Sequence, residues 1–211
     1  MRYERKYRIE DASWREVEAA VLRVPLSFQT SYPDRTVNSI YLDSSDLEAL
    51  QDNLSGIANR IKYRIRWYGK DLKNVKKPSL EKKIRLNQLG TKEHFAMPDF
   101  HIEKGFDLTD FILKNSSVGM TLQPVVLVQY VRSYYESFDK KVRATIDREL
   151  TYFHFQGSLF FENKKVEDEA VILEIKYAAE LDGQLDGVFQ NLPFRLGKNS
   201  KFVAGMFGHY Y

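Results

Sequence analysis

The sequence of 211 residues contains no cysteine, which excludes disulfides, thiolate metal ligands and a cysteine nucleophile. It also lacks any run of 18 apolar residues, so we expect no membrane-spanning helix. The first ten residues, MRYERKYRIE, have no apolar stretch of the kind found in secretory signals. We therefore expect a cytoplasmic protein, and we attribute any peripheral association with a membrane to a membrane-protein partner chain.

The chain carries little net charge, +3, from 32 Lys and Arg against 29 Asp and Glu. These totals do not indicate a nucleic-acid-binding protein, so an anion site must come from where the charges are placed. Internal repeats and low-complexity linkers are absent, and 6 prolines and 11 glycines are scattered. We expect a single domain over residues 1–211.

Strand patterns dominate the sequence, and they predict an α+β protein that is mostly β. The expected strands are Arg2–Ile9, Thr36–Asp43, Asn59–Tyr68, Ser79–Asn87, Val125–Ser137, Lys141–Arg148, one of Leu150–Phe155 and Ser158–Glu162, and Ala170–Tyr177. The expected helices are Asp11–Val24, Ser44–Asn53, Phe106–Lys114 and Leu181–Asn191, with a helical turn at Ser200–Gly208.

Charged and apolar residues alternate along RIKYRIRWYGK, residues 60–70. Successive side chains of a strand point to opposite faces, so the cations share one face and the apolar residues share the other. The cations are Lys62, Arg64 and Arg66, and the opposite residues are Ile61, Tyr63, Ile65 and Trp67.

The same alternation recurs in other expected strands, where a glutamate stands two residues before a lysine three times. These pairs are Glu4/Lys6, Glu81/Lys83 and Glu174/Lys176. Arginines also share the polar faces, at Arg132 and at Arg143, and Asp147 lies on the face of Arg143 as a candidate ion-pair partner for one of them.

Two structures explain such a pattern. A one-sided sheet shows its charged face to water, and this explains any single strand. A closed antiparallel barrel of about eight strands, with helices packed outside, instead turns the charged faces inward. Because buried unpaired cations cost several kcal/mol, such an interior must be wet and filled by a polyanion. Carboxylates left among the cations suit Mg²⁺ or Mn²⁺, which also takes phosphate oxygens.

An ordered set of short motifs covers nearly the whole chain and resembles the VTC (vacuolar transporter chaperone) polyphosphate polymerase domain. That domain belongs to the CYTH-like triphosphate tunnel metalloenzymes. The motifs are YERKY, VNSIYLDSSDL, KYRIRWYG, LEKK, YVRSYY with VRATID, LEIKY and NSKFVAG. The resemblance implies a tunnel of antiparallel strands whose basic residues bind phosphates.

The resemblance also implies roles for particular residues. The phosphate-binding and catalytic set is Lys6, Arg64, Arg66, Lys83, Arg132, Arg143 and Lys201, to which the alternation adds Lys176 for phosphate binding. Glu174 matches the metal-binding glutamate, and Glu4 and Glu81 are weaker metal candidates. The superfamily opens with Glu-x-Glu-x-Lys, but here Arg2 takes the place of the first glutamate.

The leading functional hypothesis is polyphosphate synthesis from ATP with Mn²⁺ or Mg²⁺. Two alternatives stay open: a hydrolase acting on tripolyphosphate or nucleoside triphosphates, and a non-catalytic module that binds polyphosphate or inositol phosphates. Nucleic acid is not an expected partner, because a tunnel excludes duplexes and the sequence shows no base-stacking platform. The sequence leaves the oligomeric state open.

Overall fold

The computed structural model describes residues 2–86, 89–116, 118 and 120–208, and it confirms an α+β chain that is mostly β. Most strands form one large antiparallel sheet, and β4 and β7 (Asn74–Val75 and Phe100–His101) form a separate pair. No helix within the described residues combines the length and the apolar character needed to cross a membrane.

The chain divides into two compact units, each with its own hydrophobic core. Unit 1 comprises Met1–Arg35, Tyr130–Leu150 and Asp168–Asn199, and unit 2 comprises Thr36–Gln129, Thr151–Glu167 and Ser200–Tyr211. Three long strands, β2 (Gln29–Asp43), β8 (Gln123–Glu136) and β9 (Val142–Gln156), contribute residues to both units. A single domain over residues 1–211 stays a prediction.

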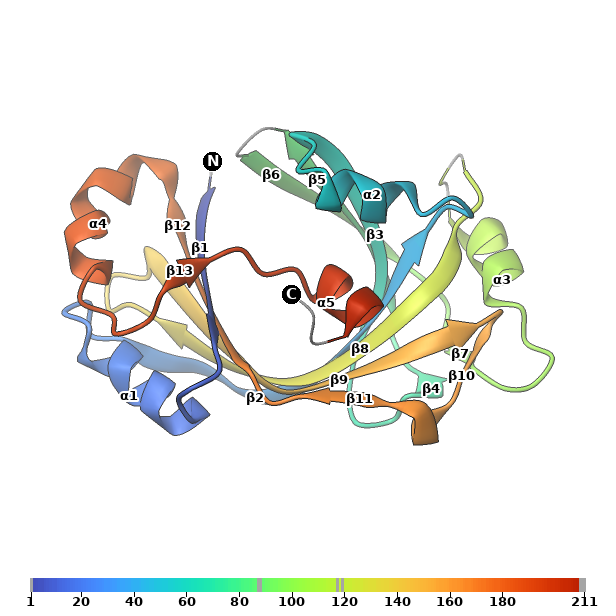
Figure 1. The fold of residues 1–211 in the computed structure, drawn as a ribbon, viewed down its shortest axis with the longest axis horizontal. Coiled ribbons are helices and arrows are strands. Elements are labelled where there is room, and N and C mark those ends of the chain that lie inside the picture. Colours follow the sequence, from blue (N-terminus) through green and yellow to red (C-terminus); the bar gives the residue numbers. More distant parts are fainter. Residues whose placement is uncertain (1, 87–88, 117, 119, 209–211) are drawn as a thin grey trace. The chain divides into compact units, whose positions relative to one another are not determined.

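In unit 1, strands β1 and β12 pair antiparallel and two helices cover their apolar face. The elements that lie wholly in unit 1 are β1 (Arg2–Ile9), β12 (Val171–Ala178), β13 (Leu196–Gly197), α1 (Trp14–Arg23), the 3₁₀ helix η2 (Ala179–Leu181) and α4 (Asp182–Phe189). Figure 1 labels all of them except η2. Helix α1 begins with a capping box, in which Ser13 accepts from the amide of Glu16 and the Glu16 carboxylate accepts from the amide of Ser13.

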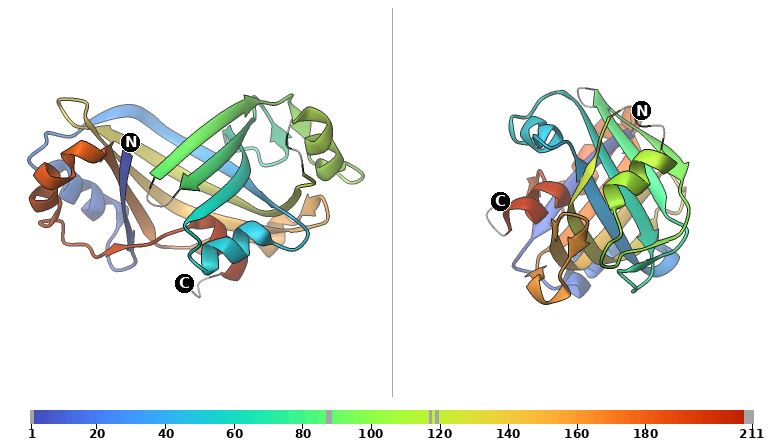
Figure 2. Two further views of the ribbon diagram at one scale, coloured as in Figure 1. Left: turned by 90° about the horizontal axis from the view of Figure 1, so that it is seen from above. Right: turned by 90° about the vertical axis from the view of Figure 1, so that its right-hand side faces the viewer.

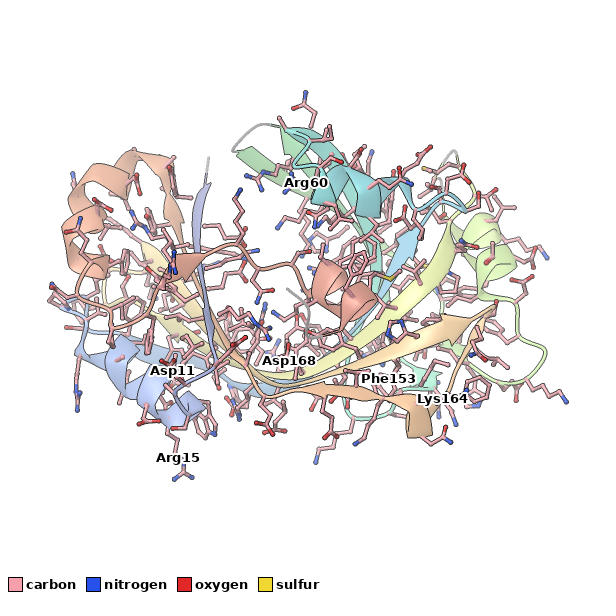
Figure 3. The ribbon with its side chains drawn as sticks, in the orientation of Figure 1. Asp11, Arg15, Arg60, Phe153, Lys164 and Asp168 are labelled. Atoms are coloured by element: carbon pink, nitrogen blue, oxygen red, sulfur yellow. The ribbon has the colours of Figure 1, made fainter. Side chains whose placement is uncertain are left out.

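One side of α1 packs into the core of unit 1. Val17 and Val21 are fully buried against strand residues such as Leu173 and Ile175. Figure 3 shows Arg15 of the same helix pointing away from the strands. The polar side of α1 therefore faces solvent, and its apolar side covers the sheet.

Unit 2 contains the remaining strands and helices. These are α2 (Glu48–Leu54), β3 (Asn59–Tyr68), β4, β5 (Ser79–Leu86), β6 (Leu89–Ala96), β7, α3 (Leu108–Asn115), β10 (Leu159–Phe160), η1 (Glu162–Lys164), β11 (Val166–Asp168, whose last residue belongs to unit 1) and α5 (Lys201–Phe207).

The alternation predicted for residues 60–70 is confirmed in β3. Ile65 and Trp67 are buried in a core that also contains Leu108 and Ile112 of α3. On the opposite face, the ring of Phe202 from α5 stacks on Tyr41 at a centroid distance of 5.2 Å, and Tyr41 pairs with Arg64 in the β2–β3 register. Helix α5 therefore lies on the polar face of unit 2, beside α2 (Figure 2).

The strands differ from expectation at β2, β6 and β9, and β2 begins at Gln29 rather than Thr36. Strand β6 was not expected, and it pairs with β5 along its whole length. Strand β9 continues to Gln156, where a break after Arg148 was expected, and Glu149 sits within it at a φ of 55°. Strand β5 ends at Leu86, and Asn87 lies outside the described residues.

Gly205 in α5 packs too closely against its neighbours to accept a methyl group. A Cβ at this position would lie 2.8 Å from Tyr152 Cδ1 and 2.9 Å from Val126 Cγ2. We expect Gly205→Ala to lower the free energy of unfolding by about 1–2 kcal/mol in urea denaturation, because overpacking outweighs the gain in helix propensity.

Gly187 in α4 provides the matched control, since no heavy atom lies within 4 Å of its added Cβ. Gly187→Ala should stabilise the protein by about 0.5–1 kcal/mol. Equal stabilisation by both substitutions would show that helix propensity alone governs α5, and the packing argument would fail.

Candidate functional site

The polar face of unit 1 carries a set of alternating acids and bases on β1 and β12. Glu4 pairs with Lys176 and Lys6 pairs with Glu174 in the strand register, so all four side chains share one face. Arg132 of β8 and Asp147 of β9 join them. We call these six residues the Glu174 cluster.

Each lysine of the Glu174 cluster contacts both glutamates. Lys6 Nζ lies 3.6 Å from Glu4 Oε2 and 3.5 Å from Glu174 Oε1. Lys176 Nζ lies 3.3 Å from Glu4 Oε1 and 3.3 Å from Glu174 Oε1. The Glu-x-Lys pairs of β1 and β12 therefore contact each other across the two strands. The carboxylates of Glu4 and Glu174 lie close to the same two ammonium groups, those of Lys6 and Lys176.

Arg132 is held by a bidentate ion pair. Its Nε and Nη2 donate to Asp147 Oδ1 and Oδ2 at 2.5 and 2.7 Å, and its Nη2 lies 3.7 Å from Glu174 Oε2. Burial alone would lower the pKa of Arg132, but Asp147 and Tyr130 raise it well above its ordinary value. Arg132 therefore stays charged, with its guanidinium plane fixed in the cluster.

Arg143 pairs with Lys176 in the β9–β12 register and so lies on the same face of the sheet. Its side chain is 65% exposed, and its Nε donates to Glu136 Oε1 at 3.1 Å. Asp147 was expected to bind one of these arginines, and the structure selects Arg132 rather than Arg143.

The polar face of unit 2 carries a second group, which surrounds a buried carboxylate. Glu81 of β5 pairs with Arg64 of β3 and with His94 of β6 in the strand registers. Arg64 Nε donates to Glu81 Oε2 at 2.5 Å, and Lys92 Nζ lies 2.7 Å from Glu81 Oε1. We call Arg64, Arg66, Glu81, Lys92 and His94 the Glu81 cluster.

Cations outnumber carboxylates in the Glu81 cluster. Burial alone would raise the pKa of Glu81, but Arg64, Arg66 and Lys92 outweigh it and lower that pKa to about 2. Burial lowers the pKa of Lys92 to about 8, and the charges of Arg64 and Arg66 act in the same direction against the attraction of Glu81. The lowered pKa of Glu81 marks the cluster as a site of positive potential, whereas the lowered pKa of Lys92 comes first from its burial.

Further cations flank the Glu81 cluster. Lys83 pairs with Lys62 on one side and with Lys92 on the other, so the three share a face. Lys62 Nζ donates to Asn53 Oδ1 at 2.7 Å and to Ser200 Oγ at 3.1 Å. Arg60, labelled in Figure 3, is on the same face of β3.

Lys201 is the first residue of α5. The hydroxyl of Ser200 accepts a hydrogen bond from the amide of Val203. Ser200 is therefore the N-cap of α5.

Sequence reasoning missed Lys92 and His94. The His94 side chain is 54% exposed, and its Nδ1 lies 3.6 Å from Glu81 Oε1. Both residues belong to β6, whose sequence LGTKEHFA has one weak signal, the alternation of Lys92 and His94 with Glu93 and Phe95.

The VTC domain model matches residues 1–208, almost the whole chain. The chain belongs to the VTC domain family. This assignment confirms the resemblance that the ordered motifs indicated. No curated protein matches this VTC-family chain.

Solved structures with the same fold include three proteins of low sequence identity. The first is a candidate adenylyl cyclase from Hippeastrum with a dominant triphosphatase activity, at a TM-score of 0.55 and 14% identity, covering 97% of this chain and 95% of that one. A candidate adenylate cyclase from Vibrio parahaemolyticus has a TM-score of 0.54 at 10% identity, with 94% of both chains covered. A protein from Pyrococcus horikoshii OT3 has a TM-score of 0.50 at 13% identity, covering 95% of this chain and 94% of that one.

The carboxylates of this VTC-family chain differ in how well they fit a divalent metal. The described part of the chain contains no group of three or more Asp, Glu and His residues that could hold one. Glu4 and Glu174 fit a site completed by water and phosphate oxygens, because their oxygens already face common cation positions. Glu81 fits poorly, because Arg64 and Lys92 already engage its oxygens.

We expect Glu81→Gln to destabilise the protein at pH 7 by about 3 kcal/mol, because three cations lose their shared carboxylate. The pKa of Glu81 is about 2 in the folded protein against 4.5 ordinarily, so its stabilisation is present above pH 4.5. That stabilisation is lost as the pH falls from 4.5 towards 2. Urea denaturation at several pH values should therefore show the difference between variant and wild type shrinking below pH 4.5.

Glu93→Gln is the control in the neighbouring strand. The Glu93 side chain is 45% exposed and lies 3.6 Å from Lys82, so its loss should cost less than about 1 kcal/mol. A Glu81→Gln effect as small as that of Glu93→Gln, or one that does not depend on pH, would contradict the charge balance described here.

Proposed function

We propose that this VTC-family chain catalyses metal-dependent phosphoryl transfer on nucleoside triphosphates and polyphosphate, with polyphosphate synthesis from ATP as its reaction. The observation that supports this best is the Glu81 cluster, in which three cations share one carboxylate. The cations that lower the pKa of Glu81 indicate positive potential there, which a bound polyanion would compensate.

Phosphate binding is assigned to basic residues on the polar faces of both units, since guanidinium and ammonium groups donate strongly to phosphate oxygens. The set is Lys6, Arg64, Arg66, Lys83, Arg132, Arg143, Lys176 and Lys201, to which the geometry adds Lys62 and Lys92. The ion pair with Asp147 holds the Arg132 plane ready for a phosphate, so little side-chain entropy is lost on binding.

Glu174 and Glu4 would hold Mn²⁺ or Mg²⁺. When bound, such an ion supplies charge neutralisation at phosphate oxygens. Lys6 and Lys176, which now bind these carboxylates, would then donate to phosphate oxygens. Glu81 would act as the counter-ion that orients Arg64 and Lys92.

In the proposed reaction, a terminal phosphate oxygen of the growing chain attacks the γ-phosphorus of ATP. One P–O bond forms to the chain, the bond between the γ-phosphorus and the bridging oxygen breaks, and ADP leaves. No protein nucleophile is needed, in keeping with Ser200 as a helix cap. A closed barrel of about eight strands within a single domain, through which the product threads, belongs to this proposal.

Hydrolysis is the alternative, and one observation favours it: the similarly folded Hippeastrum protein has a dominant triphosphatase activity. The same groups would then bind the substrate, and water would replace the phosphate acceptor. A module that binds polyphosphate or inositol phosphates without turnover is the second alternative.

A cytoplasmic location and a membrane-protein partner chain stay predictions, and nucleic acid is not an expected partner.

Incubation with ATP and Mn²⁺ should yield a dye-binding polymer on a gel together with ADP. The expected polymer should be degraded by a polyphosphatase and should be absent without the metal. Free phosphate without polymer would establish the hydrolase instead. ATP left unconsumed, with anion binding intact, would establish the binding module.

Glu174→Gln separates binding from catalysis. We expect it to reduce turnover at least about 100-fold, because the carboxylate charge that holds the metal is lost. Tripolyphosphate without metal should still stabilise the variant against thermal unfolding, by up to about 2.7 kcal/mol at 100 times its dissociation constant. The exposed Glu180 provides the control, and Glu180→Gln should change neither measurement. Full turnover in Glu174→Gln would remove Glu174 from the site.

A further inference from the structure

Three side chains of β2 and β8 contact one another in unit 1. Arg35 Cζ lies 5.1 Å from the ring centroid of Tyr32 and 5.7 Å from that of Tyr134. The two tyrosine rings meet edge to face, with centroids 5.9 Å apart and planes at 81°. We call Tyr32, Arg35 and Tyr134 the Tyr32 platform.

The Tyr32 platform is ordered by its own contacts yet open to solvent. Tyr32 is 56% exposed, whereas Tyr135 and Tyr177 of the same unit are buried in its core. Pro33 follows Tyr32 and restricts the backbone between the two β2 members of the platform. An exposed aromatic surface that is held in place in advance is suited to stacking a planar ligand.

The platform is adjacent to the Glu174 cluster on the same strand of the same unit. Tyr134 follows Arg132 by two residues on β8, so their side chains share a face and their Cα atoms lie about 7 Å apart. That spacing is comparable to the reach of a ribose between a phosphate and a base. A ligand whose phosphates bind Arg132 could therefore lay a planar ring on Tyr134, Arg35 or Tyr32.

We propose that the Tyr32 platform binds the nucleobase of a nucleoside triphosphate whose phosphates occupy the Glu174 cluster. This inference rests on the proposed function and adds a base subsite to it. Stacking on tyrosine and on a guanidinium plane tolerates any base, because every base has a π-face. The site therefore distinguishes nucleotides from inorganic phosphate chains, and it discriminates little between adenine and guanine.

Isothermal titration of the full chain with ATP, GTP and tripolyphosphate tests this site. Tyr32→Ala removes the exposed ring, and Arg35→Lys keeps the charge but removes the plane. Each should weaken ATP and GTP binding at least about 5-fold. Both should change tripolyphosphate binding less than 2-fold, which also shows that the variants are folded. Tyr32→Phe should bind ATP like wild type.

Phe138→Ala is the matched control, because Phe138 is a 77% exposed aromatic residue of unit 1 outside the platform. It should leave all three affinities unchanged. If wild type binds tripolyphosphate but Tyr32→Ala and Arg35→Lys bind ATP like wild type, the base subsite is wrong and the phosphate site survives. Equal losses for ATP and tripolyphosphate would also overturn the subsite. If wild type binds neither ligand, both proposals fail.

Discussion

An ionised side chain withdrawn from water must be paired, and this constraint governs the polar faces of both units. In unit 1 it is met internally, because three carboxylates and three cations of the Glu174 cluster share contacts with one another. In unit 2 one buried carboxylate serves three cations. In each unit, the apolar face of the strands can form a core because the charges on the opposite face are paired in this way.

The two clusters differ in their ratio of carboxylates to cations, and this difference suggests that they bind different ligands. A balanced cluster can exchange partners at little electrostatic cost, since a divalent ion can take the place of ammonium groups between Glu4 and Glu174. A cluster with surplus positive charge instead favours an anion from solution, and the lowered pKa of Glu81, where the cations outweigh burial, reflects that surplus. The proposed metal site in unit 1 and the surplus of cations in unit 2 both follow from the local ratio of acids to bases.

Sequence alternation was sufficient to predict which face of β1, β3, β5 and β12 carries charge, because a strand has a fixed period of two. It could not predict which residues pair across strands. Asp147 shares a face with Arg143, yet it binds Arg132 on a different neighbouring strand. Strand β6 was missed because its glycine, lysine, glutamate and histidine have low strand propensity, and its place is fixed by pairing with β5. Lys92 and His94 were missed with it.

The Tyr32 platform shows the same limit for aromatic residues. Tyr32 and Tyr134 are about a hundred positions apart in the sequence, so only the pairing of β2 with β8 can bring their rings together. Neither residue belongs to a recognisable stacking motif, and each on its own reads as an ordinary strand tyrosine. What makes them a ligand surface is their nearness to a fixed guanidinium, Arg132, whose burial beside Asp147 leaves its plane no other orientation. The ion pair with Asp147 fixes Arg132, and the position of Arg132 thus determines where the base of a bound nucleotide would stack on the Tyr32 platform.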